Sequence, residues 1–367
     1  MTVRAVHQLV AGYSHGDAIS NEARGIRSLF RNLGYASEIY CEGGRILPEL
    51  RQDARDLSAV HREVGAEDLV ILHLSIGAEV NEIFPGLPGV KVIRYHNVTP
   101  PAYFRALNDH IARQLELGRE QMQALAGVAD LNLAVSRYNA AELEEAGYTD
   151  VKVHPLVLEL KRLSERPDPE VLAKYADDKF NVLFVGRCAP NKRLEDLLHA
   201  FYYLQKYVNP NVRLIHVGSF AGTEQYLGML KAISRELGLA HVNFVGSVPE
   251  SHLCAYYQLA DVFVCMSEHE GFGIPLLEAM QAGVPVLAYG SAAVPETMDG
   301  AGVVFHEKCF DEIAEWIWRV GRDAGVRERV LAGQQARLAR YENDDAAGRL
   351  LAHLSPWLGA DVLEKRR

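Results

Sequence analysis

Short, nearly continuous apolar runs alternate with amphipathic stretches along the whole sequence, and this alternation is the feature that most constrains the fold. In the first half, the apolar runs lie at residues 3–10, 36–40, 69–74, 90–95 and 131–135. A stretch with helical spacing at 20–33 follows the first run and ends at Gly34. Strands that are apolar on both faces and alternate with helices predict a parallel sheet covered by helices on both sides.

The same alternation starts again after a charged, proline-containing stretch at residues 159–178. Here the apolar runs lie at 180–185, 212–217, 242–245, 262–265 and 284–288. A chain of 367 residues is also long enough to bury two cores. We therefore predict an α/β protein with two Rossmann-like, doubly wound domains, at 1–165 and 178–342, facing a central cleft. An amphipathic helix within 343–358 is expected to pack back on the first domain.

Composition narrows the classes of function. The net charge of −10 argues against generic nucleic-acid binding, which requires a basic surface. Five cysteines without a closely spaced pair indicate neither a disulfide framework nor a metal clip, so a reduced, cytoplasmic chain is expected. The N-terminal residues lack the pattern of a signal peptide, and there is no uninterrupted run of about 18 apolar residues that would predict a membrane span.

The most informative segment is 267–280, SEHEGFGIPLLEAM, which directly follows a predicted strand. Its glycines allow a tight turn, and its proline suits the first turn of a helix, whose free N–H groups form a natural phosphate site. Glu270 and Glu278 flank this turn, and a carboxylate can accept two hydroxyl hydrogen bonds from a sugar. Spacing alone leaves an ordinary turn before a solvated helix residue equally open.

A second segment between a strand and a helix, 184–194, has the sequence FVGRCAPNKRL. Arg187 stands at the strand end, and Lys192 stands at the helix start, where the helix dipole does not favour a cation. Two cations here could neutralise a leaving diphosphate, as Mg²⁺ does in other enzymes. A solvated basic loop is the alternative.

Together these segments resemble the retaining GT-B glycosyltransferases of family 4. The Glu-x7-Glu motif of that family is matched by Glu270 and Glu278, and its Gly-Arg…Lys segment by Gly186, Arg187 and Lys192. The resemblance is close over 178–342 and looser in the first half. Weaker matches are a strand end at 216–218, a loop near the donor base at 242–249, and the strand after the motif at 282–286 with 294–296.

The resemblance implies a donor site for a nucleotide-diphosphate sugar of the UDP or GDP type, without a resident cofactor or metal. The absence of a DxD motif agrees with that expectation. The implied catalytic residues are Arg187, Lys192, Glu270 and His96. The implied donor-binding residues are Gly16, Gly186, Gly218, Val248, Gly271, Phe272, Gly273, Ile274 and Glu278. In these roles Glu278 holds the ribose, Glu270 contacts the sugar, and the two cations stabilise the diphosphate.

Three features of the first half leave alternative roles open. Gly16 is expected near the donor phosphate, but the carboxylate of Asp17 would repel a phosphate unless it turns away or binds an acceptor hydroxyl. His96 follows a buried strand and resembles the active-site histidine of the family; a histidine satisfied by backbone is the alternative. Residues 103–119 are expected to form a basic, partly aromatic helix, which either meets an anionic or lipid-linked acceptor or a membrane surface, or is simply solvated.

The expected function is therefore transfer of a hexosyl group, with retention, to a hydroxyl of a saccharide or lipid-linked saccharide in cell-surface polysaccharide synthesis. The expected location is the cytoplasm, with possible peripheral contact at the inner face of the membrane. Alternatives are a nucleotide-sugar epimerase or glycan phosphorylase of the same fold, and a two-domain protein that binds a sugar or nucleotide without chemistry. The donor base, the acceptor, the linkage and the oligomeric state are not encoded in any motif that we can interpret.

Overall fold

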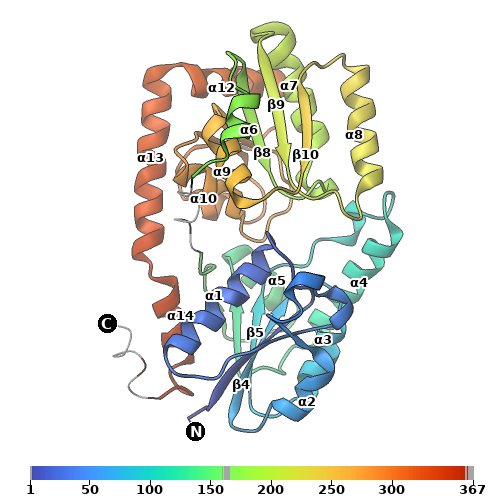
Figure 1. The fold of residues 1–367 in the computed structure, drawn as a ribbon, viewed down its shortest axis with the longest axis vertical. Coiled ribbons are helices and arrows are strands. Elements are labelled where there is room, and N and C mark those ends of the chain that lie inside the picture. The colour runs from blue at the N-terminus through green and yellow to red at the C-terminus, as the bar shows by residue number, and fades with distance from the viewer. Residues whose placement is uncertain (1, 159, 161–165, 360–361, 363–367) are drawn as a thin grey trace. The chain divides into compact units, whose positions relative to one another are not determined.

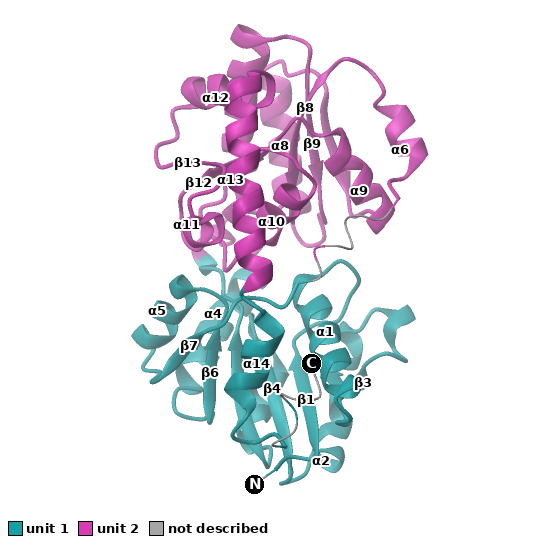
Figure 2. Cartoon of the chain, turned by 90° about the vertical axis from the view of Figure 1, so that its left-hand side faces the viewer, with its two compact units in different colours: residues 1–101, 110–158, 344–367 teal, residues 102–109, 159–343 magenta. Residues whose placement is uncertain are grey.

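Two parallel sheets carry the fold, one in each of the two units into which the chain divides (Figures 1 and 2). The computed structural model describes residues 2–158, 160, 166–359 and 362. Unit 1 comprises residues 1–101, 110–158 and 344–367, and unit 2 comprises 102–109 and 159–343. The predicted α/β class with two doubly wound, Rossmann-like sheets is confirmed.

The sheet of unit 1 has the strand order β3-β2-β1-β4-β5-β6-β7, and all its strand pairs are parallel. Its strands are β1 Ala5–Val10, β2 Ile39–Cys41, β3 Arg55–Asp56, β4 Asp68–Leu74, β5 Val90–Tyr95, β6 Leu131–Ala134 and β7 Val151–Val153. The central strands β1 and β4 are buried along their whole length, as continuous apolar runs predict.

The helices of unit 1 differ in how they begin: some have a side-chain N-cap and others do not. They are α1 Ala18–Asn32, α2 Val60–Glu63, α3 Glu79–Ile83, α4 Asp109–Ala124, α5 Arg137–Glu145 and α14 Ala346–Leu354. Ser136 is the N-cap of α5, because its side chain accepts a hydrogen bond from the backbone N–H of Asn139.

Helix α14 completes the core of unit 1, although nearly two hundred residues separate it from the preceding part of that unit. Leu350, Leu351 and Leu354 are fully buried and share one apolar cluster with Ile26 and Phe30 of α1. Figure 2 shows α14 in the colour of unit 1. The amphipathic pattern at the end of the sequence is therefore used to cover the first sheet.

Unit 2 has a six-stranded parallel sheet of order β10-β9-β8-β11-β12-β13. Its strands are β8 Phe180–Val185, β9 Val212–Val217, β10 Val242–Gly246, β11 Val262–Cys265, β12 Val286–Tyr289 and β13 Val303–Phe305. Its helices are α6 Pro169–Lys174, α7 Leu194–Tyr203, α8 Glu224–Glu236, α9 Glu250–Leu259, α10 Ile274–Gln281, α11 Val294–Met298, α12 Phe310–Arg322 and α13 Ala324–Asn343.

Residues 102–109 belong to unit 2, although unit 1 supplies the chain on both sides of them. Within unit 2, the Tyr103 hydroxyl donates to Glu268 Oε2 at 3.3 Å, and Asn108 Nδ2 donates to the Gly222 carbonyl at 2.8 Å. This segment turns at the buried Phe104, whose carbonyl accepts from the N–H of Asn108 at 2.7 Å.

The expected single basic helix over 103–119 is therefore wrong, because the helix starts only at Asp109. On that helix Arg119 is engaged within unit 1: it pairs with Glu142 at 3.0 Å and donates to the Val98 carbonyl at 2.9 Å. Among the described residues, no helix is both long and apolar enough to cross a membrane.

Candidate functional site

The carboxyl ends of β8 and β9 approach one another through two glycines. A Cβ atom on Gly218 would lie 1.9 Å from the carbonyl oxygen of Gly186, so no side chain fits there. The φ angles of Gly186 and Gly218 are +155° and +154°, which also favours glycine. His216 Nε2 lies 2.9 Å from the same carbonyl, and since a carbonyl only accepts, this nitrogen carries the hydrogen. The result is an open backbone surface at the edge where parallel sheets bind ligands.

The start of α10 has the features predicted for an anion site. Gly273 is its N-cap, with a φ of +92° and without a side-chain capping hydrogen bond, and Pro275 lies in the first turn. Helix N–H groups without a side-chain acceptor are available to an anionic ligand. Phe272 contributes only backbone, because its ring is buried and packs 6.2 Å from the ring of Tyr341. Gly271 and Ile274 beside it are half-buried.

Lys192 and Glu270, which the sequence assigns to the same site from distant segments, form an ion pair of 2.7 Å. Both side chains are largely buried, at 17% and 14% exposure. Lys192 belongs to a 3₁₀ turn at Pro190–Lys192, directly before α7. The lysine is therefore not a solvated cation at a helix start: it is neutralised by the carboxylate that is predicted to contact the sugar.

Arg187 is the cation of this region that lacks an ion pair within the described part of the chain. It follows Gly186 at the end of β8, is exposed, and donates from Nη2 to the Ala221 carbonyl at 2.9 Å. Its charge is thus held at the ligand edge of the sheet by a neutral acceptor, so an incoming anion would not have to displace a carboxylate.

Glu278 lies within α10 and is buried, with 4% exposure. The hydroxyl of Tyr257, on α9, donates to its Oε2 at 2.9 Å. A buried carboxylate that is held by a hydrogen bond has a fixed position. Its predicted contact with a ribose remains a prediction, as does that of Val248, which is half-buried in the loop between β10 and α9.

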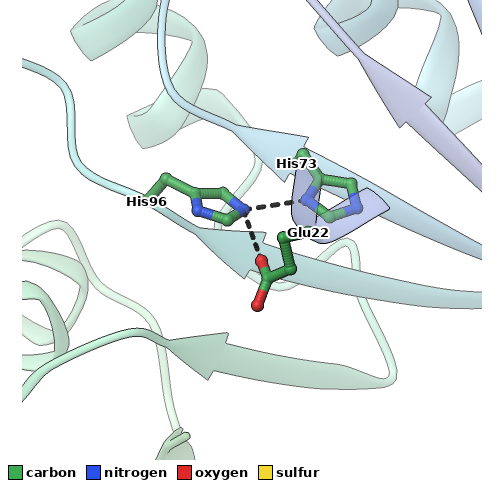
Figure 3. A group of neighbouring side chains, drawn as sticks. All are labelled: Glu22, His73 and His96. Carbon is green, nitrogen blue, oxygen red and sulfur yellow. Dashed lines mark hydrogen bonds and ion pairs between the residues drawn. The ribbon is translucent and has the colours of Figure 1, made fainter. Parts of the chain in front are cut away.

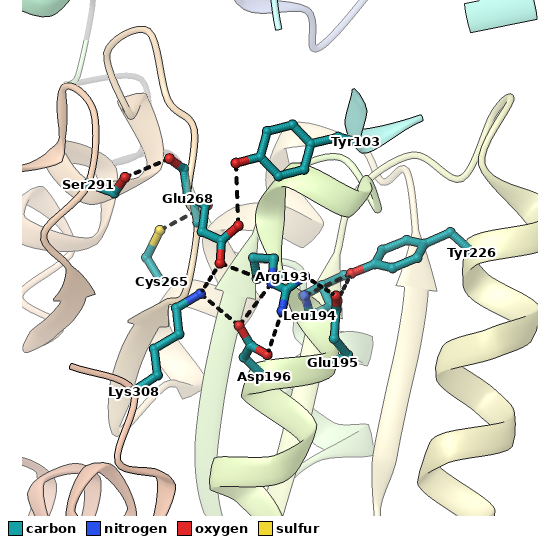
Figure 4. A network of polar contacts seen from close by, with 11 residues as sticks. Tyr103, Arg193, Leu194, Glu195, Asp196, Tyr226, Cys265, Glu268, Ser291 and Lys308 are labelled. Atoms are coloured by element: carbon teal, nitrogen blue, oxygen red, sulfur yellow. Dashed lines mark hydrogen bonds and ion pairs between the residues drawn. The ribbon is translucent and has the colours of Figure 1, made fainter. Parts of the chain in front are cut away.

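A network that sequence reasoning missed holds the loop before α10 (Figure 4). Lys308 Nζ contacts Asp196 Oδ2 at 2.7 Å and Glu268 Oε1 at 2.9 Å. Arg193 Nε contacts the same two oxygens at 3.0 and 3.3 Å. Arg193 also pairs with Glu195 at 3.0 Å. Three carboxylates and two cations, from the start of α7, the loop before α10 and the segment before α12, thereby fix the backbone of the loop that contains Glu270.

The backbone of this loop is tied down as well. The N–H of Glu268 donates to the carbonyl of Asn191 at 2.9 Å, and Asn191 Nδ2 donates to the carbonyl of His269 at 3.0 Å. Ser291 Oγ donates to the carbonyl of Glu268 at 2.6 Å. Asn191 immediately precedes Lys192, so the two candidate segments are joined by backbone contacts beside their ion pair. The sequence signal for this network is the density of charge at 192–196, KRLED.

In unit 1, Gly16 lies in the loop after β1, with a φ of +68° and open space around its Cα. Asp17 is the N-cap of α1, and its Oδ2 accepts from the N–H of Ser20 at 2.8 Å. The carboxylate is therefore turned toward the helix, where it has a structural role. The expected conflict with a phosphate at Gly16 is resolved without an acceptor hydroxyl.

His96 follows β5 and belongs to a buried polar group (Figure 3). Its Nε2 lies 2.8 Å from His73 Nδ1 and 3.5 Å from Glu22 Oε2. Arg94 makes two contacts with Glu22, at 2.5 and 2.8 Å. Burial lowers the pKa of His96 to about 4. The negative charge of Glu22 acts to raise this pKa, whereas the positive charge of Arg94 lowers it further.

Sequence reasoning identified His96 and missed the residues around it. His73 and Arg94 interrupt otherwise apolar strands, VILHL and VIRY, and a polar residue in such a run must find a buried partner. That interruption was the available signal.

The whole chain has the two-domain GT-B fold seen in solved glycosyltransferases. The structure of Anabaena Alr3699/HepE in complex with UDP and glucose matches with a TM-score of 0.74 at 18% identity, covering 96% of this chain and 100% of that one. The sucrose-phosphate synthase tll1590 from Thermosynechococcus elongatus matches with a TM-score of 0.74 at 18% identity, covering 96% and 99%. At this identity the likeness shows the fold alone.

The segment that contains most of the candidate donor residues matches a known family model. Residues 167–337 match the model described as glycosyl transferases group 1. O-antigen chain mannosyltransferase B of Escherichia coli is 32% identical over 44% of this chain and 42% of its own length. A GDP-mannose-dependent alpha-(1-6)-phosphatidylinositol monomannoside mannosyltransferase of Mycobacterium tuberculosis is 28% identical over 64% of each chain. These alignments span about half the length of the relatives. The resemblance to a GT-B glycosyltransferase is confirmed.

Proposed function

We propose that this chain is a retaining glycosyltransferase that moves a hexosyl group from a nucleotide-diphosphate sugar to a hydroxyl of a saccharide or lipid-linked saccharide. The observation that carries the proposal is the arrangement at the ligand edge of unit 2. Three features lie there on adjoining loops, within the segment that matches the glycosyltransferase family model. They are the charge of Arg187, which has no ion pair among the described residues, the Lys192–Glu270 pair, and the start of α10, which has no side-chain cap.

In this mechanism the diphosphate binds at the N–H groups of α10 and beside Arg187. Lys192 exchanges its contact with Glu270 for a phosphate oxygen, and Glu270 then accepts hydrogen bonds from sugar hydroxyls. Glu278 accepts from the ribose hydroxyls. The bond between the sugar C1 and the phosphate oxygen breaks as the acceptor oxygen bonds to C1 on the same face. The departing phosphate oxygen takes the acceptor's proton, so no side chain is needed as a base and no metal is needed to neutralise the leaving group.

The relatives suggest which donor to test first. Both relatives described above are named mannosyltransferases, and one of them is GDP-mannose-dependent. Their names also refer to an O-antigen chain and to a phosphatidylinositol monomannoside, which supports a role in cell-surface glycan synthesis. We therefore infer GDP-mannose as the first candidate, with UDP-sugars as the second because a solved neighbour binds UDP and glucose.

The test is a titration of the thermal midpoint with UDP, GDP and ADP and then with their hexose conjugates. A ligand that binds only the folded state stabilises it by about 2.7 kcal/mol at a hundred times its dissociation constant. We expect one nucleotide to raise the midpoint and Glu278→Ala to abolish the rise. If no nucleotide raises the midpoint of the unaltered protein, the donor site does not exist and the proposed function is wrong.

A further inference from the structure

Three polar side chains form a line across the middle of the unit 1 sheet. Gln8 on β1, His73 on β4 and His96 after β5 stand on adjacent strands in the sheet order. Gln8 Oε1 lies 2.9 Å from His73 Nε2, and His73 Nδ1 lies 2.8 Å from His96 Nε2. Gln8 and His73 are fully buried. Polar groups at this depth are retained only where each has a partner.

The hydrogen positions along this line follow from its first member. Gln8 Nε2 donates to the carbonyl of Ala23 at 2.9 Å, so its Oε1 is the atom that faces His73. An amide oxygen only accepts, and His73 Nε2 therefore carries a hydrogen. His73 is neutral, because burial and the neighbouring ring of His96 keep its pKa well below the usual value. Its Nδ1 is then an acceptor, and His96 Nε2 must donate to it.

The assignment leaves His96 Nδ1 with a free lone pair. Among the described residues, the side chain of His96 makes polar contacts only with His73 and Glu22, and both contacts use Nε2. In Figure 3 the other ring nitrogen of His96 lies on the side away from His73 and Glu22. His96 directly follows the carboxyl end of β5, the edge at which parallel sheets bind ligands.

A metal ion is the competing explanation, because Glu22, His73 and His96 offer ligand atoms within 4.8 Å of one another. The charge balance opposes it: Arg94 already neutralises Glu22 through two contacts. A divalent ion would lie beside that guanidinium and would displace the hydrogen from His96. The two histidine nitrogens are also 2.8 Å apart, whereas two tetrahedral ligands at about 2.1 Å from zinc are separated by about 3.4 Å.

We propose that Gln8 and His73 are positioning residues that fix His96 as the neutral, Nε2-protonated tautomer, so that its Nδ1 accepts a hydrogen bond from a substrate hydroxyl. The fixed tautomer is a property of unit 1 alone; the identity of the hydroxyl rests on the proposed function, in which it belongs to the donor sugar or the acceptor. His96 at Nδ1 therefore selects a hydrogen-bond donor and rejects a group that only accepts.

The tautomer can be measured without turnover. In the protein labelled with ¹⁵N-histidine, we expect the His96 signals to show one nitrogen in the protonated range, correlated as Nε2, and Nδ1 in the unprotonated range. His96→Asn identifies these signals by their loss. His73→Phe removes the acceptor and should shift the ring toward a mixture of tautomers. A wild-type ring that is Nδ1-protonated, or already mixed, overturns the proposal.

Kinetics then test whether the positioning matters. With the donor and acceptor that show turnover, His73→Phe and His96→Ala should each lower kcat/KM by at least tenfold. The double variant should be no slower than His96→Ala, because His73 acts through His96. His73→Gln, which offers an amide oxygen to His96, should recover part of the loss. Additive losses in the double variant would mean that His73 is only structural.

A matched control comes from the same strand as Gln8. His7 is buried on β1, but neighbouring side chains of a strand point to opposite faces, and His7 contacts Glu38 and Asp68 instead. His7→Gln should leave both the His96 tautomer and kcat/KM unchanged. If the tautomer is as expected and no glycosyl transfer is found with any donor, the proposed function fails and the tautomer assignment stands.

Discussion

At the scale of single residues, unit 1 contains several buried titratable groups whose charge states are fixed by their surroundings. Burial lowers the pKa of His96 to about 4 and that of His154 to about 3. His154 Nδ1 accepts from Arg94 at 2.8 Å, which requires the neutral ring, and its Nε2 donates to the Ala346 carbonyl at 2.8 Å. Glu22 remains ionised, because the attraction of Arg94 outweighs burial and lowers its pKa to about 2.

These shifts predict that unit 1 loses stability in acid. A histidine in the unfolded chain takes up a proton near pH 6.5, whereas folded His96 takes one up only near pH 4. The contribution of His96 to the free energy of unfolding is therefore complete above pH 6.5 and is lost as the pH falls toward 4. For one such group the loss by pH 4 is about 3 kcal/mol. We expect the thermal midpoint to fall across this window, and to fall less steeply in His96→Asn. Equal slopes in both proteins would show that His96 does not resist protonation.

The second residue-scale prediction concerns the cations of unit 2. Arg187→Ala and Lys192→Ala should each lower turnover a hundredfold or more, because each removes charge that stabilises the leaving diphosphate. Steady-state rates with saturating donor measure the effect. Lys206→Ala removes an exposed lysine beyond the C-terminal end of α7, the helix that Lys192 precedes, and should leave the rate unchanged. Near-normal turnover in both site variants would contradict the mechanism.

At the scale of elements, the contact between the ends of β8 and β9 depends on the absence of one side chain. A Cβ on Gly218 would meet the Gly186 carbonyl at 1.9 Å, so Gly218→Ala must separate the strand ends and should cost at least about 3 kcal/mol of unfolding free energy. Gly16→Ala is the matched control, since its Cβ would enter open space and only the positive φ costs about 1 kcal/mol. Urea denaturation of both variants compares the two costs.

A second prediction at this scale concerns the first helix. Asp17→Ala should lower stability by about 1 kcal/mol, because the N–H of Ser20 loses its acceptor. Asp17→Asn keeps an acceptor oxygen and should recover most of the loss. If the two variants are equally destabilised, Asp17 stabilises the helix through its negative charge and not through the capping hydrogen bond.

The sequence predicted elements well where one local signal decided them. The strands at 90–95, 180–185, 212–217 and 262–265 were predicted with their observed bounds, because each is a mainly apolar run that begins and ends with an apolar or aromatic residue or cysteine. Helix α7 ends at Tyr203 and continues as a π-helical turn, Leu204–Val208, which no residue type signals. The Lys192–Glu270 contact joins positions 78 apart and depends on tertiary structure, so the motif predicted the residues and not their pairing.

At the scale of the whole molecule, each unit has its own sheet and core, and α14 belongs to the core of unit 1. Leu351→Ala removes a fully buried side chain of α14 and should destabilise unit 1 by about 2–5 kcal/mol. Hydrogen exchange should quicken in β1 and β4 and stay slow in β8 and β9. Equal acceleration in both sheets would mean that the two units unfold as one.

The path of the chain between the units has a consequence for synthesis on the ribosome. Unit 1 begins first, but its core also uses Leu350, Leu351 and Leu354, which are translated after every residue of unit 2. Nascent domains usually mature in the order in which they emerge. In this chain unit 2 can fold first, and until α14 has been translated one apolar face of the unit 1 sheet stays uncovered. We expect a nascent-chain chaperone to bind this uncovered apolar face.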